Sequence, residues 1–255
     1  MESSDLFRVL GKTACVTGSA RGLGREIALC LAQKGASVIL ADQVYPEETA
    51  EQITNRGSHC IGIQADISDE TQVKRLVKQS LSEFSKVDIL VKNAGVSQLS
   101  YTPTEELPVE EWDSIIRTNL RGTFLCCKHV GKHMINSGGG TIVNIATTAG
   151  ITGVPRAPAY CASKAGVILL TKTLALEWAG YNIRVNAIAP HYLETGLTKE
   201  LRDSEKVYGS LAKQIPLKRF GKTSEVLGAI LLLSSPASSY MTGTVIVVDG
   251  GYLAQ

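Results

Sequence analysis

The sequence predicts one α/β domain in which a parallel β-sheet lies between layers of helices. Short apolar runs alternate with longer amphipathic stretches along the whole 255-residue chain. Strands that are apolar on both faces and separated by helices are typical of parallel sheets, because helices then cover both faces of the sheet. Since no linker, repeat or low-complexity tract interrupts this pattern, residues 1–255 are expected to form a single domain.

The same pattern gives the expected order of the elements. Gly35 follows the first expected helix as its C-cap, and Pro46 lies in the first turn of the second helix. Asp69 begins the third helix, where a negative charge interacts favourably with the helix dipole. We expect strands over residues 12–17, 36–41, 58–65, 87–91, 141–146, 183–189 and 244–248. We expect helices over residues 22–34, 46–56, 69–84, 108–134, 159–179, 196–212 and 224–234.

The composition argues against several classes of protein. The formal net charge of +2 is too small to indicate nucleic acid or an anionic membrane as a partner. No apolar stretch approaches the roughly 20 residues that span a bilayer. Residues 1–5 lack the basic start of a signal peptide, so a cytoplasmic location is expected. The six cysteines contain no Cys-x-x-Cys pair and are expected to be reduced. His129-x-x-x-His133 has no neighbouring carboxylate cluster, so no metal site is expected.

A glycine-rich segment follows the first expected strand and opens the first expected helix. It reads Thr17-Gly18-Ser19-Ala20-Arg21-Gly22-Leu23-Gly24. Glycines let the backbone pass close to a pyrophosphate, and a helix N-terminus presents free N–H groups to it. The glycines alone are equally typical of a tight turn. Asp42, however, ends the next strand, about 20 residues after the glycine segment, where an acidic residue can reach the adenosine ribose hydroxyls. The two features together predict dinucleotide binding.

Two residues bear on the choice of dinucleotide. A carboxylate at Asp42 repels the 2′-phosphate of NADP, whereas the guanidinium of Arg21 could pair with that phosphate. Because Asp42 occupies the ribose position, we expect NAD as the coenzyme and NADP as the less favoured one.

Tyr160 and Lys164 are four residues apart in an expected helix and therefore share one face of it. An ammonium near a phenol favours the phenolate by charge attraction. A free tyrosine has a pKa of about 10, so a base that works near neutral pH needs a shift of roughly 3 units, or about 4 kcal/mol. The spacing alone is typical of a solvated helix face, and its meaning depends on the rest of the chain.

Several motifs in register resemble the short-chain dehydrogenase/reductase family, from about Leu10 to Gly251. They are Thr17-Gly18-x-x-x-Gly22-x-Gly24, Asp66, Asn93-Ala94-Gly95, Asn119, Tyr160-x-x-x-Lys164 and the loop over residues 190–195. The resemblance implies a single Rossmann domain with a doubly wound, seven-stranded parallel sheet. It also implies a homotetramer and an NAD(P)-dependent enzyme that interconverts a secondary alcohol and a ketone.

The resemblance further implies roles for individual residues. Tyr160 would be the catalytic acid/base, Lys164 would hold the nicotinamide ribose, and Asn119 would kink the long helix and hold a water that passes the proton outward. Asp66 and Ile67 would bracket the adenine. The alternatives are a helix-surface amide for Asn119 and a helix-start acid for Asp66. The expected coenzyme contacts are Gly18, Ser19, Arg21, Gly22, Leu23, Gly24, Asp42, Asp66, Ile67, Asn93, Ala94, Gly95, Tyr160, Lys164, Pro190, Leu193 and Thr195.

Three positions depart from the family's pattern. Thr147 stands where the catalytic serine is usual. It keeps a hydroxyl, but its methyl group stiffens χ1. We predict that Thr147 takes the catalytic role, with Thr148 as the less favoured candidate.

His191 replaces a glycine after proline, and its imidazole is expected to point away from the nicotinamide, toward the substrate. Lys92 replaces an asparagine near the coenzyme at the sheet edge, and no role is assigned to it.

The substrate loops, about residues 147–156 and 190–213, are polar. This favours a polyol, sugar or sugar acid, with Arg156 or His191 as candidates to meet a carboxylate and residues 194–213 as a lid. Two alternatives stay open. One is an NADPH-dependent reductase of 3-oxoacyl thioesters, and the other is a non-catalytic dinucleotide-binding regulator. The expected substrate contacts are Thr147, Thr148, Val154, His191 and Tyr192.

Overall fold

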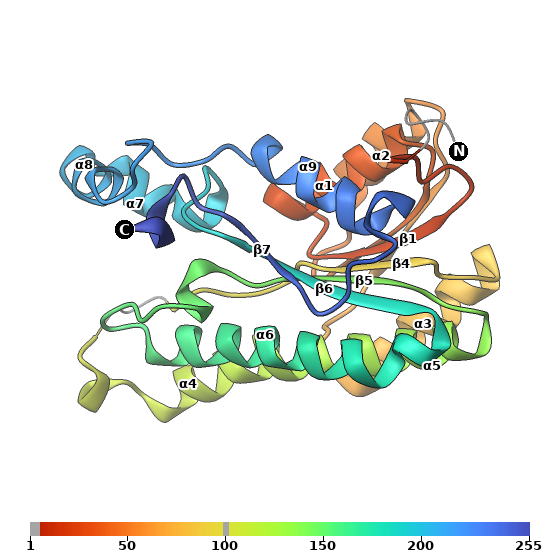
Figure 1. The fold of residues 1–255 in the computed structure, drawn as a ribbon, viewed down its shortest axis with the longest axis horizontal. Helices are drawn as coiled ribbons and strands as arrows, with labels where there is room; N and C mark the ends of the chain where they lie inside the picture. Colours follow the sequence, from red (N-terminus) through yellow and green to blue (C-terminus); the bar gives the residue numbers. More distant parts are fainter. Residues whose placement is uncertain (1–5, 99–101) are drawn as a thin grey trace.

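Seven parallel strands form the centre of the protein, for which the computed structural model describes residues 6–98 and 102–255 (Figure 1). In the sheet they follow the order β3-β2-β1-β4-β5-β6-β7. The order reverses between β1 and β4, and ligands of open α/β sheets bind at such a switch point. The prediction of a doubly wound, seven-stranded sheet is confirmed. The strands are β1 (Thr13–Thr17), β2 (Ser37–Asp42), β3 (Cys60–Gln64), β4 (Ile89–Lys92), β5 (Gly140–Ile145), β6 (Ile183–Pro190) and β7 (Val245–Val248).

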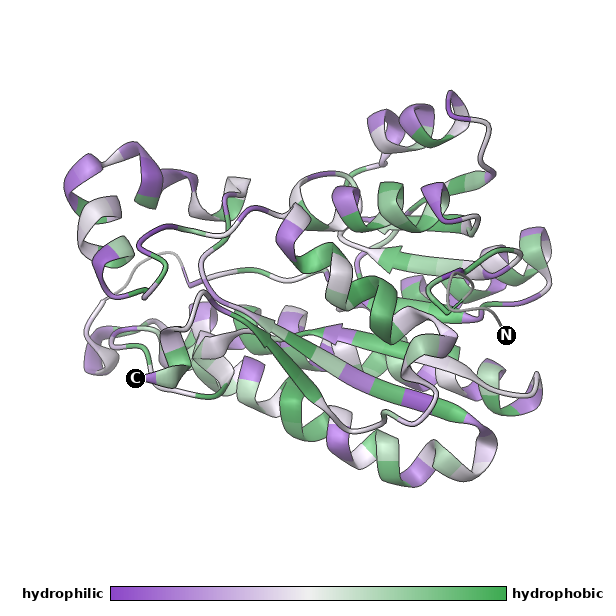
Figure 2. Ribbon diagram, turned by 45° about the horizontal axis from the view of Figure 1, so that its top comes forward, coloured by the Kyte–Doolittle hydropathy of each residue, from purple (hydrophilic) through white to green (hydrophobic). Residues whose placement is uncertain are grey.

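Two layers of helices cover the sheet. One face carries α1 (Gly22–Gln33), α2 (Glu47–Thr54) and α9 (Ser224–Ser234), and the other carries α3 (Glu70–Phe84), α5 (Gly122–Asn136) and α6 (Pro158–Trp178) (Figure 1). Each layer packs on its own apolar cluster, with Ile27 and Ile230 on the first face and Leu76 and Met134 on the second. Hydrophobic residues accordingly concentrate in the strands, and hydrophilic ones on the outer helices (Figure 2).

The expected helix over residues 108–134 is interrupted. α4 (Val109–Ile116) passes into a π-helical segment, Arg117–Arg121, before α5 begins. Such segments are rare and occur frequently at functional sites. Asn119 lies at the middle of this one, where the sequence predicted a distortion.

The expected helix over residues 196–212 was wrong as a single element. A 3₁₀ turn (Gly196–Thr198) leads into α7 (Lys199–Asp203), and α8 (Glu205–Lys213) follows after a break at Ser204. Ser204 has extended backbone angles, and its hydroxyl accepts a hydrogen bond from the N–H of Val207. The serine therefore caps a new helix instead of continuing the old one. α7 and α8 stand apart from the two helical layers, beyond one end of the strands (Figure 1).

The expectation that no apolar stretch approaches the length of a bilayer span is wrong for one segment. The segment Pro158–Tyr181, which contains α6, reaches a mean hydropathy of 1.2 over 18 residues, the composition of a candidate membrane span. Its inner side packs on the sheet and buries the polar Ser163, Lys164 and Thr171, as expected of a core helix. Residues 1–5, on which the expectation about a signal peptide rested, lie outside the described residues.

Candidate active site

The predicted site residues lie in one row along the carboxyl edge of the sheet. Asp66 follows β3, Asp42 ends β2, the glycine turn follows β1, Asn93 and Asn119 follow β4, and the remaining residues follow β5 and β6. Neighbouring strands are about 4.8 Å apart, so the row from β3 to β6 extends over roughly 24 Å. This length fits an extended dinucleotide whose two ends meet different loops.

The glycine turn lies between β1 and α1 at the switch point. Gly18 and Gly22 have positive φ angles of 68° and 58°, which L-residues rarely adopt. A Cβ atom at position 24 would stand 1.9 Å from the carbonyl oxygen of Gly18, so Gly24 has no room for a side chain. Ser19 is buried beneath the turn, and Leu23 is half-buried in the first turn of α1. The backbone thus remains accessible at the N-terminus of α1, where phosphate groups bind.

Asn93 ties the glycine turn to the loop after β4. Its side-chain Nδ2 donates to the carbonyl oxygens of Thr17 and Gly18, both at 3.1 Å. The backbone N–H groups of Asn93 and Ala94 donate to the Thr17 hydroxyl. Because its amide is committed to the turn, Asn93 supports the shape of the coenzyme site.

The carboxylate of Asp42 lies against the same turn. Its Oδ2 accepts from the N–H of Ala20 at 2.9 Å, and its Oδ1 accepts from the N–H of Val44 at 3.3 Å. Two backbone donors therefore hold a negative charge at the ribose end of the site. Arg21, whose guanidinium could pair with a 2′-phosphate, is exposed on the turn.

Asp66 and Ile67 lie at the adenine end of the row. Asp66 accepts from the N–H of Ser68 at 2.8 Å, whereas the N-cap of α3 is Asp69. The alternative of Asp66 as the acid that starts the helix is therefore wrong. Ile67 is 3% exposed and offers little surface to a ligand beyond its backbone. An open pocket of about 610 Å³ lies here, lined by Gln43, Gln64, Asp66, Gln72 and Arg75.

Tyr160 and Lys164 lie together on α6, with the Lys164 Nζ 5.9 Å from the centroid of the tyrosine ring. Lys164 is 5% exposed, and its Nζ donates to the carbonyl oxygen of Ile145 at 2.8 Å. Burial, followed by the charge of Lys92, lowers the pKa of Lys164 to about 7. A cation at this position favours the phenolate form of the tyrosine, as the sequence spacing predicted.

Asn119 connects the π-helical segment to both sides of the site. Its Nδ2 donates to the carbonyl oxygen of Val96 at 2.9 Å and to the Ser163 hydroxyl at 3.1 Å, while its Oδ1 accepts from the N–H of Val96. A Cβ atom on Gly95 would lie 3.0 Å from the Asn119 Oδ1 and 3.6 Å from the Lys164 Nζ. Asn119 is fully buried, so the alternative of a helix-surface amide is wrong.

The two threonines after β5 have different partners. The Thr147 hydroxyl donates to the carbonyl oxygen of Pro190 at 3.0 Å, and the Thr148 hydroxyl lies 2.7 Å from Nδ1 of His191. Thr148 is 1% exposed and Thr147 is 9% exposed. Thr147 is thus the more exposed residue of the two, and it stays the predicted catalytic one.

His191 packs into an aromatic cluster. Its ring stacks on Tyr252 with centroids 3.9 Å apart and an interplanar angle of 13°, and it lies 4.4 Å from the ring of Tyr192. Burial lowers the pKa of His191 to about 4, although the nearby Asp249 opposes the shift. The imidazole is therefore neutral at neutral pH and supplies no positive charge to a substrate carboxylate. No sequence motif marks Tyr252, since this contact forms only when the C-terminal segment folds back over the site.

The remaining predicted residues lie on the loops that border the cleft. Leu193 is buried and pairs with Gly221 in an isolated bridge, and the N–H of Thr195 donates to the Thr198 hydroxyl at 3.3 Å. The N–H of Val154 donates to the thiol of Cys161 at 3.4 Å. The bridge to Gly221 holds one substrate loop near the start of α9, and the bond to Cys161 holds the other to α6.

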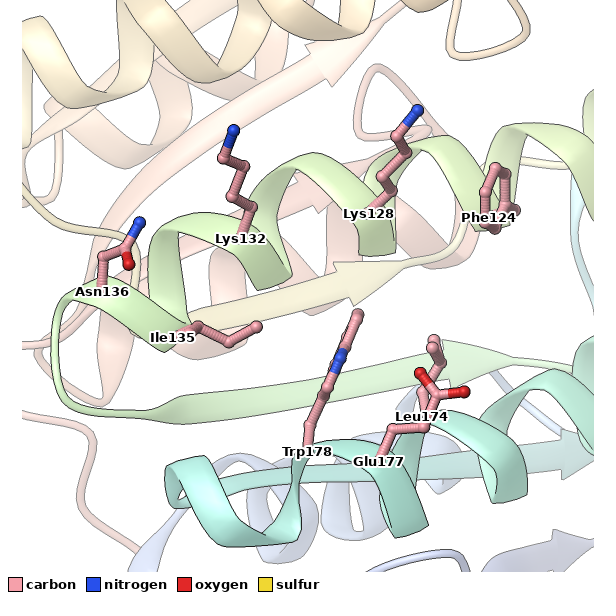
Figure 3. A pocket seen from close by; sticks show the side chains of 8 residues that line it. All are labelled: Phe124, Lys128, Lys132, Ile135, Asn136, Leu174, Glu177 and Trp178. Carbon is pink, nitrogen blue, oxygen red and sulfur yellow. The ribbon is translucent and has the colours of Figure 1, made fainter.

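A second, separate groove lies away from this edge, between α5 and α6 (Figure 3). It has a volume of about 280 Å³, and Trp178 of α6 reaches toward α5 within it. The histidines on α5 have local partners, since His129 contacts Glu70 at 2.9 Å and His133 accepts from the N–H of Val87. Within residues 6–98 and 102–255 no group of three metal-binding side chains is present. The groove is lined by Phe124, Lys128, Lys132, Ile135, Asn136, Leu174, Glu177 and Trp178.

Comparison with known proteins identifies the class. Residues 18–253 match a family model described as Enoyl-(Acyl carrier protein) reductase, and the chain belongs to the short-chain dehydrogenase/reductase family. It is therefore an oxidoreductase, and its coenzyme is a pyridine nucleotide. The predicted family and enzyme class are confirmed.

Individual relatives differ in what their names say they act on. The chain is 41% identical to D-threitol dehydrogenase of Mycolicibacterium smegmatis over 251 residues, which cover 96% of this chain and 94% of the relative. It is 40% identical to a 3-oxoacyl-[acyl-carrier-protein] reductase of Thermotoga maritima over 249 residues, covering 96% and 99%. A gluconate 5-dehydrogenase from Burkholderia cenocepacia, solved with NADP and tartrate, superposes with a TM-score of 0.94 at 33% identity over 100% of both chains.

Proposed function

We propose that this protein interconverts a secondary alcohol and a ketone on a small polyol or sugar-type substrate, with NAD as the coenzyme. The observation that carries the substrate class is Gln98. It is 1% exposed, and its Nε2 donates to the carbonyl oxygen of Arg156 at 2.9 Å. Its Oε1 is buried and has no hydrogen-bond partner among the described residues. A buried acceptor of this kind costs about 1–3 kcal/mol until a donor reaches it.

The position of Gln98 connects that acceptor with the reaction. It lies two residues beyond Val96, which Asn119 holds, and its partner Arg156 precedes Tyr160 on the approach to α6. On this proposal, a hydroxyl group next to the reacting carbon of a polyol would donate to that oxygen. A 3-oxoacyl thioester has no hydroxyl neighbour of this kind in its ketone form.

The side chains divide the work of the reaction. Tyr160 takes the proton of the substrate hydroxyl during oxidation and returns it during reduction. Lys164 stabilises the phenolate, and Thr147 binds the substrate oxygen. The Thr147 hydroxyl donates to the carbonyl oxygen of Pro190 and accepts from the N–H of Ala149 at 3.4 Å, so its oxygen keeps one lone pair to accept a hydrogen bond from an alcohol. The bound pyridine nucleotide supplies the hydride acceptor or donor.

A substrate panel tests the proposal. The panel holds D-threitol, gluconate and acetoacetyl-coenzyme A, each assayed with NAD(H) and NADP(H) at the nicotinamide absorbance. We expect turnover of polyols or sugar acids. We also expect Gln98→Leu to lower kcat/KM for them by roughly 10- to 100-fold, because it removes the acceptor. Turnover of the thioester alone would instead establish the 3-oxoacyl reductase alternative.

The preference for NAD is proposed from the carboxylate of Asp42, which two backbone N–H groups hold beside the glycine turn. A 2′-phosphate at this position would face a fixed like charge. Asp42→Ser removes that charge while keeping a small polar side chain. The ratio of kcat/KM for NAD to that for NADP should fall by roughly 100-fold. Arg21→Ala is the matched control, because it should lower only the residual activity with NADP. A wild-type preference for NADP would contradict the assignment.

We also propose a homotetramer in the cytoplasm. Three apolar side chains on the outer helices support the assembly, since Phe124 is 45% exposed, Leu169 66% and Leu176 84%. Phe124 also borders the groove between α5 and α6 (Figure 3). Sedimentation velocity should show a tetramer that Leu176→Lys dissociates, and a monomeric wild type would refute it. The six unpaired cysteines support a reducing compartment, which cell fractionation would test.

A further inference from the structure

Lys92 is a buried cation beside the catalytic residues. It ends β4, an inner strand between β1 and β5, and is 2% exposed. Its Nζ donates to the carbonyl oxygen of Ala94 and, at 3.5 Å, to that of Asn119. Among the residues that the structure describes, Lys92 has no salt bridge to a carboxylate. A buried ammonium without an anionic partner is costly, so a functional reason for its presence is expected.

The two carbonyl groups that Lys92 contacts belong to the segments that form the site. Ala94 precedes Gly95, the residue that faces both Asn119 and the Lys164 Nζ. The carbonyl of Asn119 lies in the π-helical segment, and it also accepts from the Thr123 hydroxyl at 2.5 Å. The ammonium thus holds the loop after β4 to the π-helix from behind the site.

Lys92 also acts on Lys164 by charge. Burial lowers the pKa of Lys92 to about 8, and its charge is the second cause, after burial, of the low pKa of Lys164. The other titratable groups that face Lys92 are the thiols of Cys126 and Cys127 on α5. Burial raises the pKa of both thiols, to about 11 and about 12, so they remain neutral and do not compensate the positive charges.

We propose that Lys92 is a positioning residue of the active site. It fixes the carbonyl groups of Ala94 and Asn119, next to Gly95 and the Lys164 Nζ, and it adds a second buried positive charge behind the site. The inference rests on the acid/base role of Tyr160 and not on the identity of the substrate.

The direct test follows the lysine side chains by NMR in the whole protein, labelled with ¹³C at lysine Cε. Wild type should show two lysines that titrate well below the usual value of about 10.4. Lys164→Met should remove one of these signals. Lys92→Gln should remove the other and raise the midpoint of Lys164 by about one pH unit, because a neighbouring like charge is lost. Lys78→Met, on the exposed side of α3, is the control and should leave both low midpoints unchanged.

A kinetic test separates charge from positioning. Gln retains a donor for the two carbonyl groups, whereas Met does not, and both lack the charge. The acid limb of kcat/KM for alcohol oxidation should move to higher pH by about one unit in Lys92→Gln and in Lys92→Met alike. The value of kcat at the optimum should fall further in Lys92→Met. The measurement uses the polyol that turns over in the substrate panel. If no polyol turns over, the proposed substrate class fails, while the NMR titration still decides the inference.

Each result has a definite meaning. An unchanged Lys164 midpoint in a folded Lys92→Gln would overturn the charge role, and equal kcat values in the two variants would overturn the positioning role. Should Lys92→Met not fold by circular dichroism, Lys92→Gln carries the test. Should neither fold, the wild-type and Lys164→Met spectra decide. A single low-titrating lysine in wild type would then refute the proposal, and two would support it.

Discussion

The burial of His191 predicts a specific loss of stability in acid. Histidine has a pKa of about 6.5 in an unfolded chain, whereas the folded protein lowers it to about 4. Between these values the unfolded chain binds more protons, so His191 makes stability rise with pH. Its full contribution is present above about pH 6.5 and is lost as the pH falls toward 4. The shift of about 2.5 units corresponds to about 3 kcal/mol, and partial exposure of the ring reduces this to about 2 kcal/mol.

His191→Phe isolates this effect. Phenylalanine keeps an aromatic ring against Tyr252 and Tyr192 but has no proton to gain, and it leaves the hydroxyl of Thr148 without its partner. The variant should be less stable than wild type at pH 7 and should lose less stability on acidification. For a chain of this length about 2 kcal/mol corresponds to roughly 4–8 °C in Tm. Carboxylate effects common to both proteins cancel in the difference between the two Tm curves.

The assay is thermal unfolding followed by circular dichroism between pH 7 and pH 4.5 at constant protein concentration. We expect the Tm difference between wild type and His191→Phe to close by several degrees over this range. His59→Phe is the control, because the His59 side chain is 60% exposed and should not reproduce the trend. Parallel Tm curves for wild type and His191→Phe would refute the buried, neutral state of His191.

Three further predictions concern the site itself. Tyr160→Phe should lower kcat by at least about 100-fold, because the acid/base is lost, while the Kd for NADH in a fluorescence titration changes little. Activity that survives this change would refute the mechanism. Thr147→Ala should lower kcat, whereas Thr148→Ala should act mainly on stability, because its hydroxyl is closed off; the reverse order in steady-state assays would show that the wrong hydroxyl was chosen. Gly24→Ala should weaken NADH binding by roughly 100-fold, since its Cβ would overlap a backbone carbonyl. Gly228→Ala, in open space on α9, should bind NADH normally, and equal binding by both variants would contradict the close approach at Gly24.

The sequence by itself determined the order of the elements and the row of loops. Apolar runs on both faces require helices on each side of a parallel sheet, and the carboxyl ends of parallel strands meet at one edge. The glycine turn and Asp42 therefore had to lie on that edge. Local spacing also placed the ammonium beside the phenol, because residues four apart share a helix face. These features follow from short-range periodicity, which the sequence carries directly.

Only the tertiary structure decided how side chains distant in sequence share the site. The break at Ser204 depends on a local capping bond that competes with helix propensity. The stack of His191 on Tyr252 needs the C-terminal segment to fold back. The amide nitrogen of Gln98 donates to Arg156 from a distant segment, while its oxygen has no partner among the described residues. The place of Lys92 behind Asn119 likewise depends on which helix covers β4. Hydrogen bonds, burial and the pKa shifts that they cause are properties of contacts across the fold, and no local pattern specifies them.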